Sequence, residues 1–158
     1  MVLTVLLCVV GLALFYSNST DDFVPILDHA NLAFHEAGHI IFGILGNTAG
    51  LYGGTLGQYV FPSIALVTFL KRANWFAAAL CLLWLFQNTI YMARYMADAR
   101  AQQLPLVGGG AHDWTNIFSR WNVLAADVTI AYFFTVLAWL GMLATLLWLG
   151  KKWLLKQS

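Results

Sequence analysis

The stretch WFAAALCLLWLFQNTIYM at residues 75–92 contains no charged side chain and is long enough for most of a membrane-spanning helix. The whole chain has the same character. Of its 158 residues, 61% are hydrophobic and only 9% are charged, and the mean hydropathy is +0.74. Soluble domains carry about 25% charged residues and could not bury so much apolar surface. The composition therefore predicts a multi-pass integral membrane protein, which in a bacterium would lie in the cell inner membrane.

The remaining apolar segments set the expected topology. The five segments, including an extended version of the stretch above, cover 2–16, 26–45, 55–70, 75–97 and 122–150. We expect 2–16 to be an uncleaved anchor, because no basic residues precede it. If 55–70 enters the membrane and returns, Lys71, Arg72 and the C-terminal lysines all fall on the inner side, as the positive-inside rule favours. The sequence thus predicts one all-α membrane domain over 1–158, with about four transmembrane helices and a re-entrant glycine-rich segment between the second and third.

The motif FHEAGHI at residues 34–40 carries the chemistry. Its Glu36 is the only glutamate in the chain and stands between two histidines. On a helix, His35 and His39 lie one turn apart and project from the same face, where they can bind one Zn²⁺. Glu36 can then reach a water molecule at the metal and act as a general base. Ionisable residues in a membrane segment are costly and usually functional, so the pattern predicts a zinc site.

This motif resembles that of the site-two protease family of intramembrane zinc metalloproteases. The likeness covers roughly residues 30–130, and its only sharp element is HEAGH. It implies that His35 and His39 are zinc ligands, that Glu36 is the catalytic base, and that an aspartate near a later core helix is the third ligand. That aspartate usually belongs to an LDG or NPDG-like motif, which this chain lacks; LPLVGGGAHDW stands in its place at 104–114.

Two neighbouring residues compete for the role of third ligand. Asp113 fits the family resemblance, whereas His112 fits the general preference of zinc for imidazole. One of them could also ligate while the other orients it. Alternatively, Asp113 caps the helix that begins near Trp114. Asp127 is a weaker alternative ligand, or else it pairs with Arg94, Arg120 or another polar group in the bundle.

Other polar residues in apolar surroundings allow more than one interpretation. Gln87 and Asn88 could stabilise an oxyanion or orient a ligand, or they could bridge neighbouring helices. The stretch GGTLGQYV at 53–60 could form an edge strand for an extended substrate, or a glycine-rich turn. Asp28 and His29 precede the motif and could support its ligands.

These features favour a zinc-dependent metalloprotease that hydrolyses peptide bonds of membrane-associated substrates. Its partners would be a membrane protein or peptide substrate and the lipid bilayer, and the net charge of +1 gives no basis for binding nucleic acid. A metal-binding or structural subunit of a larger membrane assembly, without proteolytic activity, is the main alternative. A zinc hydrolase acting on lipid or another non-peptide bond is a third.

Overall fold

The computed structural model describes the whole chain except residues 21, 108–110 and 156–158. Its elements are the helices α1 (Val2–Asn18), α2 (Pro25–Gly43), α3 (Asn47–Lys71), α4 (Trp75–Ala97) and α5 (Asp113–Arg120), the short 3₁₀ helix η1 (Leu124–Ala126), and α6 (Asp127–Leu154). The described residues contain no strand, which confirms the predicted all-α class. Among them, α3, α4 and the segment Leu124–Leu154 are long and apolar enough to cross a membrane, and Val2–Asn18 is a shorter apolar helix.

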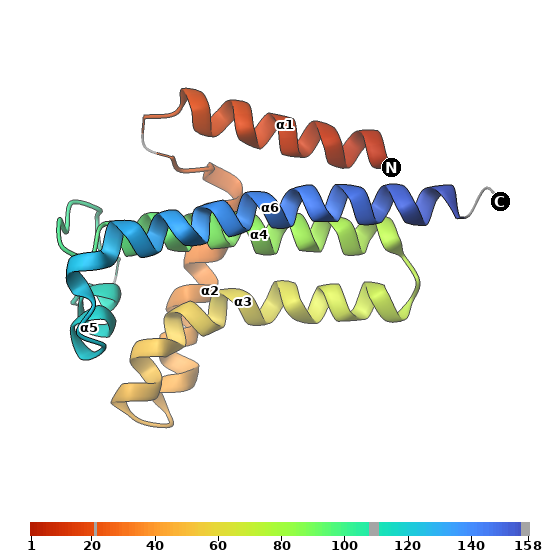
Figure 1. The fold of residues 1–158 in the computed structure, drawn as a ribbon. Coiled ribbons are helices and arrows are strands. Elements are labelled where there is room, and N and C mark those ends of the chain that lie inside the picture. The colour runs from red at the N-terminus through yellow and green to blue at the C-terminus, as the bar shows by residue number, and fades with distance from the viewer. Residues whose placement is uncertain (21, 108–110, 156–158) are drawn as a thin grey trace.

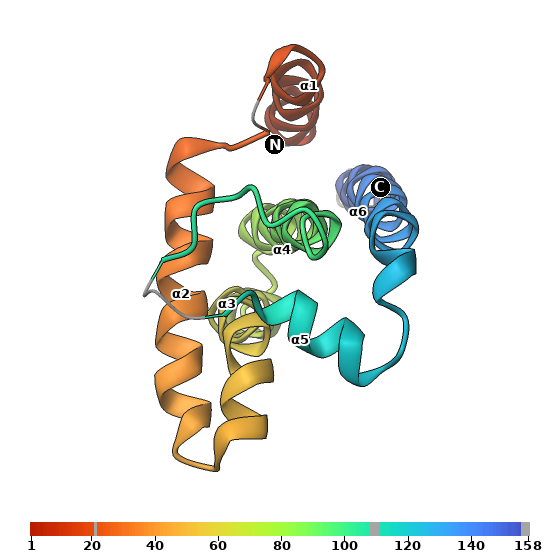
Figure 2. The ribbon, with the colours of Figure 1, turned by 90° about the vertical axis from the view of Figure 1, so that its left-hand side faces the viewer.

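The second helix runs across the others. Figure 1 shows α1, α4, α6 and the second half of α3 running side by side, and Figure 2, which looks along them, shows α2 passing over one end. The turn between α3 and α4, the start of α1 and the end of α6 lie at the opposite end. The segment expected at 26–45 is therefore a helix, but it does not run parallel to the other long helices.

The glycine-rich segment is helical too. Residues 55–70 belong to the continuous helix α3, so the predicted edge strand and the predicted turn at 53–60 are both wrong, and the re-entrant segment is not confirmed. Figure 1 shows α3 bending between a first half beside α2 and a second half beside α4. Pro62 lies inside this helix and cannot donate to the carbonyl of Gln58 one turn earlier. Asn88 Nδ2 donates to that carbonyl at 3.0 Å, so a side chain of α4 satisfies the group that proline leaves unpaired.

Glycines let α2 and α3 pack backbone against backbone. A Cβ atom at Gly38 of α2 would lie 2.1 Å from the Gly53 carbonyl oxygen of α3. In the reverse direction, a Cβ at Gly57 would lie 2.5 Å from the Phe34 carbonyl oxygen. Small residues four apart permit such an approach between membrane helices. The backbone of α3 thus fills the space beside Gly38.

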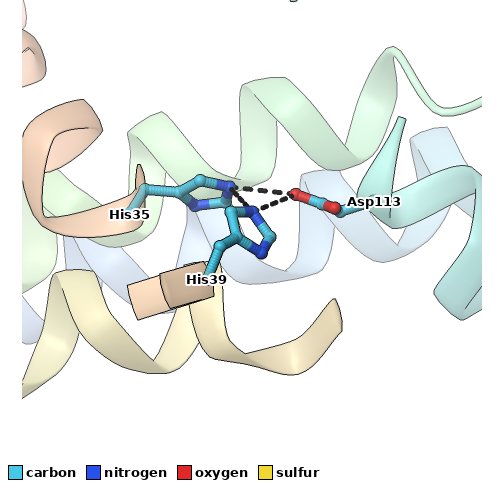
Figure 3. A group of neighbouring side chains, drawn as sticks. All are labelled: His35, His39 and Asp113. Carbon is cyan, nitrogen blue, oxygen red and sulfur yellow. Dashed lines mark hydrogen bonds and ion pairs between the residues drawn. The ribbon is translucent and has the colours of Figure 1, made fainter. Parts of the chain in front are cut away.

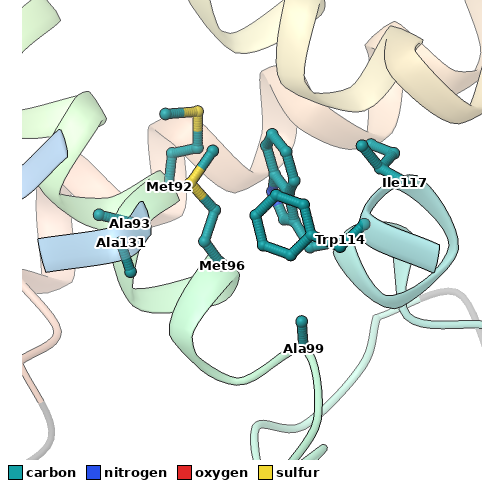
Figure 4. Packing of buried hydrophobic residues seen from close by; sticks show 8 residues of the cluster. Met92, Ala93, Met96, Ala99, Trp114, Ile117 and Ala131 are labelled. Atoms are coloured by element: carbon teal, nitrogen blue, oxygen red, sulfur yellow. The ribbon is translucent and has the colours of Figure 1, made fainter. Parts of the chain in front are cut away.

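Apolar packing fixes α5 beneath the end of the bundle. Figure 4 shows Met92 and Met96 of α4 beside Trp114 and Ile117 of α5, with Ala131 of α6 joining the same cluster. A second cluster, which includes Val5, Leu83 and Met142, joins α1, α4 and α6 further along. The first cluster positions α5 against α4, and this brings Asp113 to the histidines of α2.

Candidate metal centre

Three potential ligand atoms meet where α2, α3 and α5 converge. His35 Nε2 lies 2.9 Å and His39 Nε2 lies 3.1 Å from Asp113 Oδ2, and the two nitrogens are 3.1 Å apart. Figure 3 shows the two imidazoles and the carboxylate pointing at one another. The structure therefore unites the two histidines of the motif with an aspartate that lies 74 residues after His39.

Helix α3 supplies the space and the orientation for both imidazoles. A Cβ at Gly54 would lie 2.5 Å from the Nε2 atoms of His35 and His39, so only glycine leaves room for the rings. The Nδ1 atom of His39 lies 2.8 Å from the Gly50 carbonyl oxygen, and since a carbonyl can only accept, Nδ1 carries the proton. A histidine that ligates a metal typically donates its other ring N–H in this way.

The carboxylate comes from the first residue of α5. The Asp113 backbone N–H donates to Tyr95 Oη of α4 at 3.1 Å, which places the start of α5 beside the histidines. Burial opposes ionisation of the Asp113 carboxyl, but its hydrogen bonds with His35 and His39 outweigh that effect and lower its pKa to about 2. The side chain is therefore an anion at neutral pH.

His112 has a different task. Its Nδ1 accepts a hydrogen bond from the Thr115 backbone N–H at 3.3 Å, which caps α5, and its Nε2 lies 3.5 Å from Asp98 Oδ2. Burial lowers the pKa of His112, which favours the neutral ring that this cap requires. Of the two residues expected to compete, Asp113 is the one that lies in the cluster, and the cap expected of Asp113 is made by His112.

The hydrogen-bonding pattern requires a proton or a metal ion among the three ligand atoms, and the hydrogen bond to Asp113 raises the pKa of His39 to about 9, so a proton alone can meet this requirement. With Nδ1 protonated, a neutral His39 directs its Nε2 lone pair towards the Asp113 carboxylate and towards His35. Such an arrangement is repulsive unless a proton or a metal ion lies between the atoms. Two ligands at about 2.05 Å from a tetrahedral zinc are separated by about 3.3 Å. The observed separations of 2.9–3.1 Å are close to this value, so the donor set fits a metal ion.

Glu36 lines the same cavity as the cluster. This cavity has a volume of about 840 Å³ and lies between α2, α4 and the segment that follows α4. Glu36 is half-buried, and no described residue hydrogen-bonds to its carboxylate or forms an ion pair with it. Its carboxylate therefore remains available to take a proton from a molecule in the cavity.

The other two polar residues expected near the site have structural contacts instead. Asn88 supports the bend of α3, as described above. Asp127 is buried at the start of α6 and forms an ion pair with Arg100, with 2.7 Å between Oδ1 and Nη2. Neither belongs to the group of ligand atoms found among the described residues. Asp127 therefore pairs with an arginine, but with neither Arg94 nor Arg120.

Gln87 belongs to a buried polar network that joins three helices. Its Nε2 donates to Asp28 Oδ1 at 2.5 Å and to Tyr16 Oη at 3.2 Å. Asn31 Nδ2 donates to Gln87 Oε1 at 3.0 Å, and Trp84 donates to Asn31. This arrangement agrees with the interpretation that Gln87 bridges neighbouring helices. Asp28 is fully buried within the network rather than beside the histidines.

Three residues that hold the site were not found by sequence reasoning. Gly54 and Tyr95 act as described, while Asp98 accepts the backbone N–H groups of Gln103 and Leu104 and so orders part of the cavity wall. The pattern of glycines around Gly54 was the one available signal, because glycines at four-residue spacing predict a close helix contact.

The fold and the cluster together define a class: an all-helical protein with three helices long enough to cross a membrane and two histidines and an aspartate converging in a cavity. No family model, curated protein or solved structure matches this chain.

Proposed function

We propose that this chain is a zinc-dependent membrane protease that hydrolyses peptide bonds of membrane-associated substrates. One observation carries the proposal: His35, His39 and Asp113 present three ligand atoms within 3.1 Å of one another, in a cavity that Glu36 also lines. Catalytic zinc sites commonly have three protein ligands and one open position. The adjacent general base distinguishes this arrangement from a structural zinc site, which is closed by four ligands.

In the proposed reaction, three residues bind the metal ion and Glu36 transfers the proton. His35, His39 and Asp113 would hold Zn²⁺, which supplies a Lewis acid that polarises the scissile carbonyl and lowers the pKa of water. Glu36 takes a proton from water as the water oxygen attacks the carbonyl carbon. The C–N bond then breaks, and Glu36 passes that proton to the departing amine. The apolar wall formed by Leu32, Leu104 and Leu106 limits the access of bulk water.

For the membrane topology we propose four spans, namely α1, α3, α4 and α6, with α2 lying near the membrane surface. The perpendicular course of α2 supports this arrangement, because α3 then returns across the membrane without a re-entrant segment. The hairpin tip between α2 and α3 exposes Ile40, Ile41 and Ile44, which suits insertion among lipids at the interface. Lys71, Arg72, Lys151 and Lys152 all fall at the end opposite the cluster, so the positive-inside rule puts the site on the non-cytoplasmic side.

Single cysteines test this topology. In a background with Cys8 and Cys81 changed to serine, Ser119→Cys near the site and Arg72→Cys at the opposite end are treated with a membrane-impermeant maleimide in intact cells. We expect labelling of Ser119→Cys alone. Labelling of both or of neither variant rules out the proposed four-span arrangement, and labelling of Arg72→Cys alone reverses its orientation.

Metal analysis and peptide cleavage test the enzyme. Purified wild-type protein should contain about one zinc per chain and generate new termini in a peptide mixture read by mass spectrometry. Glu36→Gln should keep zinc and lose cleavage, and Asp113→Ala should lose zinc. His112→Ala is the matched control and should keep zinc, because His112 faces Asp98.

Normal cleavage by Glu36→Gln, or a wild-type protein without tightly bound metal, contradicts the protease proposal. Bound zinc without cleavage of any peptide, together with co-purification in a larger assembly, would instead support the metal-binding subunit.

A further inference from the structure

The cavity extends beyond the three ligands to a group of donors around Phe23. The ring of Phe23 lies 5.0 Å from that of His29 and 6.4 Å from that of Tyr91, between ring centroids. The guanidinium carbon of Arg94 lies 5.8 Å from the Phe23 centroid. All four side chains line the same cavity as Glu36. We call these four residues the Phe23 group.

Arg94 is the only lysine or arginine among the described residues that line this cavity. The other arginines at this end of the bundle are occupied elsewhere: Arg100 pairs with Asp127, and Arg120 donates to Thr48 Oγ1. In the described part of the chain no carboxylate comes within 4.0 Å of the Arg94 guanidinium. Arg94 therefore brings to the cavity wall a positive charge that no described carboxylate pairs with.

The nearby buried carboxylate of Asp28 interacts with Arg94 through space but forms no ion pair with it. Asp28 accepts hydrogen bonds from the Gln87 side chain at 2.5 Å and from the Val24 backbone N–H at 2.7 Å. Its oxygens are thus directed into the network between the helices. A buried or half-buried arginine without a carboxylate partner is well suited to bind an anion from outside.

We propose that the Phe23 group is a subsite for a carboxylate of the peptide substrate, with Arg94 as its specificity-determining residue. The proposal rests on the proposed function in that Glu36 marks where the scissile bond lies. Arg94 provides a bidentate donor, and the hydroxyl of Tyr91, whose ring also neighbours Phe23, can add a hydrogen bond. The Nδ1–H of His29 donates to the Pro25 carbonyl, so His29 contributes its ring to the wall of the subsite and not a hydrogen bond to the carboxylate.

Helix geometry gives the distance from Glu36 to His29, which belongs to the Phe23 group. His29 and Glu36 are seven residues apart on α2, which corresponds to about 10 Å along the helix axis. An extended peptide advances about 3.3 Å per residue. The acidic group should therefore lie about three residues from the bond that is cleaved. Because the proposed reaction is the cleavage of a peptide bond beside Glu36, the acidic group is assigned to the peptide.

A binding experiment tests the subsite without requiring turnover. The probe is a fluorescent Leu/Ala peptide with one aspartate about three residues from its central bond, in two versions that place the aspartate on either side. The control probes carry asparagine in its place. Binding to zinc-loaded Glu36→Gln protein in detergent is followed by fluorescence anisotropy.

We expect one aspartate probe to bind about 10- to 100-fold more tightly than its asparagine twin. Adding Arg94→Ala should abolish this preference, Arg94→Lys should retain part of it, and the matched change Arg120→Ala should leave it intact. A thermal melt of each variant excludes a general loss of fold.

Three outcomes overturn the proposal: equal binding of the twins, no binding up to millimolar probe, or equal weakening of both twins by Arg94→Ala. Displacement of both probes by phosphatidylglycerol, in a manner that depends on Arg94, would instead assign the anion site to lipid. If zinc and cleavage persist while the acidic preference is absent, only the subsite fails. If wild-type protein holds no zinc and cleaves nothing, the proposed function fails, whatever the probes show.

Discussion

The substitution Gly54→Ala should weaken metal binding at the proposed site and leave the fold intact. A Cβ at this position would lie 2.5 Å from both Nε2 atoms, whereas ordinary contact begins at 3.4 Å, so each ring nitrogen must retreat by about 0.9 Å. Helix α3 cannot easily move away instead, because Gly53 and Gly57 hold its backbone against α2. The imidazole rings of His35 and His39 must therefore move.

The expected loss of zinc affinity is large. Metal–ligand distances tolerate deviations of about 0.2 Å, far less than the required shift, and the shift affects two of the three ligands. Substitutions that only disturb the orientation of a ligand already cost about 10- to 100-fold in affinity. We expect Gly54→Ala to weaken zinc binding by about 100-fold or more, which corresponds to about 2.7 kcal/mol.

Stability should respond differently. Alanine is a better helix former than glycine by about 1 kcal/mol, so in the presence of a chelator the variant should melt at or above the wild-type temperature. The matched control is Gly43→Ala, whose Cβ would meet nothing within 4 Å. Zinc affinity is measured by competition with a chromophoric chelator. If Gly54→Ala binds zinc within threefold of wild type, the close approach of α3 to the histidines does not shape the site.

Further substitutions probe the supports of the site. Gly38→Ala brings a Cβ within 2.1 Å of the Gly53 carbonyl oxygen. It should therefore lower the free energy of unfolding by about 2 kcal/mol or more, and lower the melting temperature, even when a chelator removes the metal. Asn88→Ala leaves the Gln58 carbonyl unsatisfied and should cost about 1–3 kcal/mol in denaturant or thermal unfolding. Tyr95→Phe removes the acceptor of the Asp113 N–H and should weaken zinc binding by about tenfold in the chelator competition.

A specific outcome would contradict each of these three predictions. A Gly38→Ala protein as stable as wild type would mean that the two helices can separate at little cost. Unchanged stability of Asn88→Ala would show that another donor, such as water, reaches the freed carbonyl. Unchanged zinc affinity of Tyr95→Phe would show that apolar packing alone positions α5.

Residues close together in the sequence were the ones that could be predicted. The spacing of His35 and His39 on a helix was enough to bring them to one face, because the helical repeat is fixed by backbone geometry. The choice between His112 and Asp113 could not be made in this way. It depends on which of two adjacent residues caps α5, and the side chains at the cap and at the first helical position point in different directions.

The direction of α2 could not be predicted from the sequence for a related reason. Its length and apolar content match a membrane span, but its polar residues recur along one side: Asp28, Asn31 and His35 are buried, while Ile40, Ile41 and Ile44 are exposed. That pattern is typical of a helix lying at an interface. The backbone contact with α3 at the glycines and the polar network with α4 together hold the helix in this direction.

The bend of α3 allows this one helix to pack against both α2 and α4. Without Pro62, a straight α3 could follow α4 along its length or follow α2, but it could not do both, since these helices run across each other. Asn88 stabilises the bend from α4, and the bend directs the glycine face of α3 towards His35 and His39. The geometry of the candidate site is thus set by a proline and an asparagine that never touch it. Substitutions at these two positions should therefore alter zinc affinity through the placement of Gly54, and restoring stability by other means should not recover it.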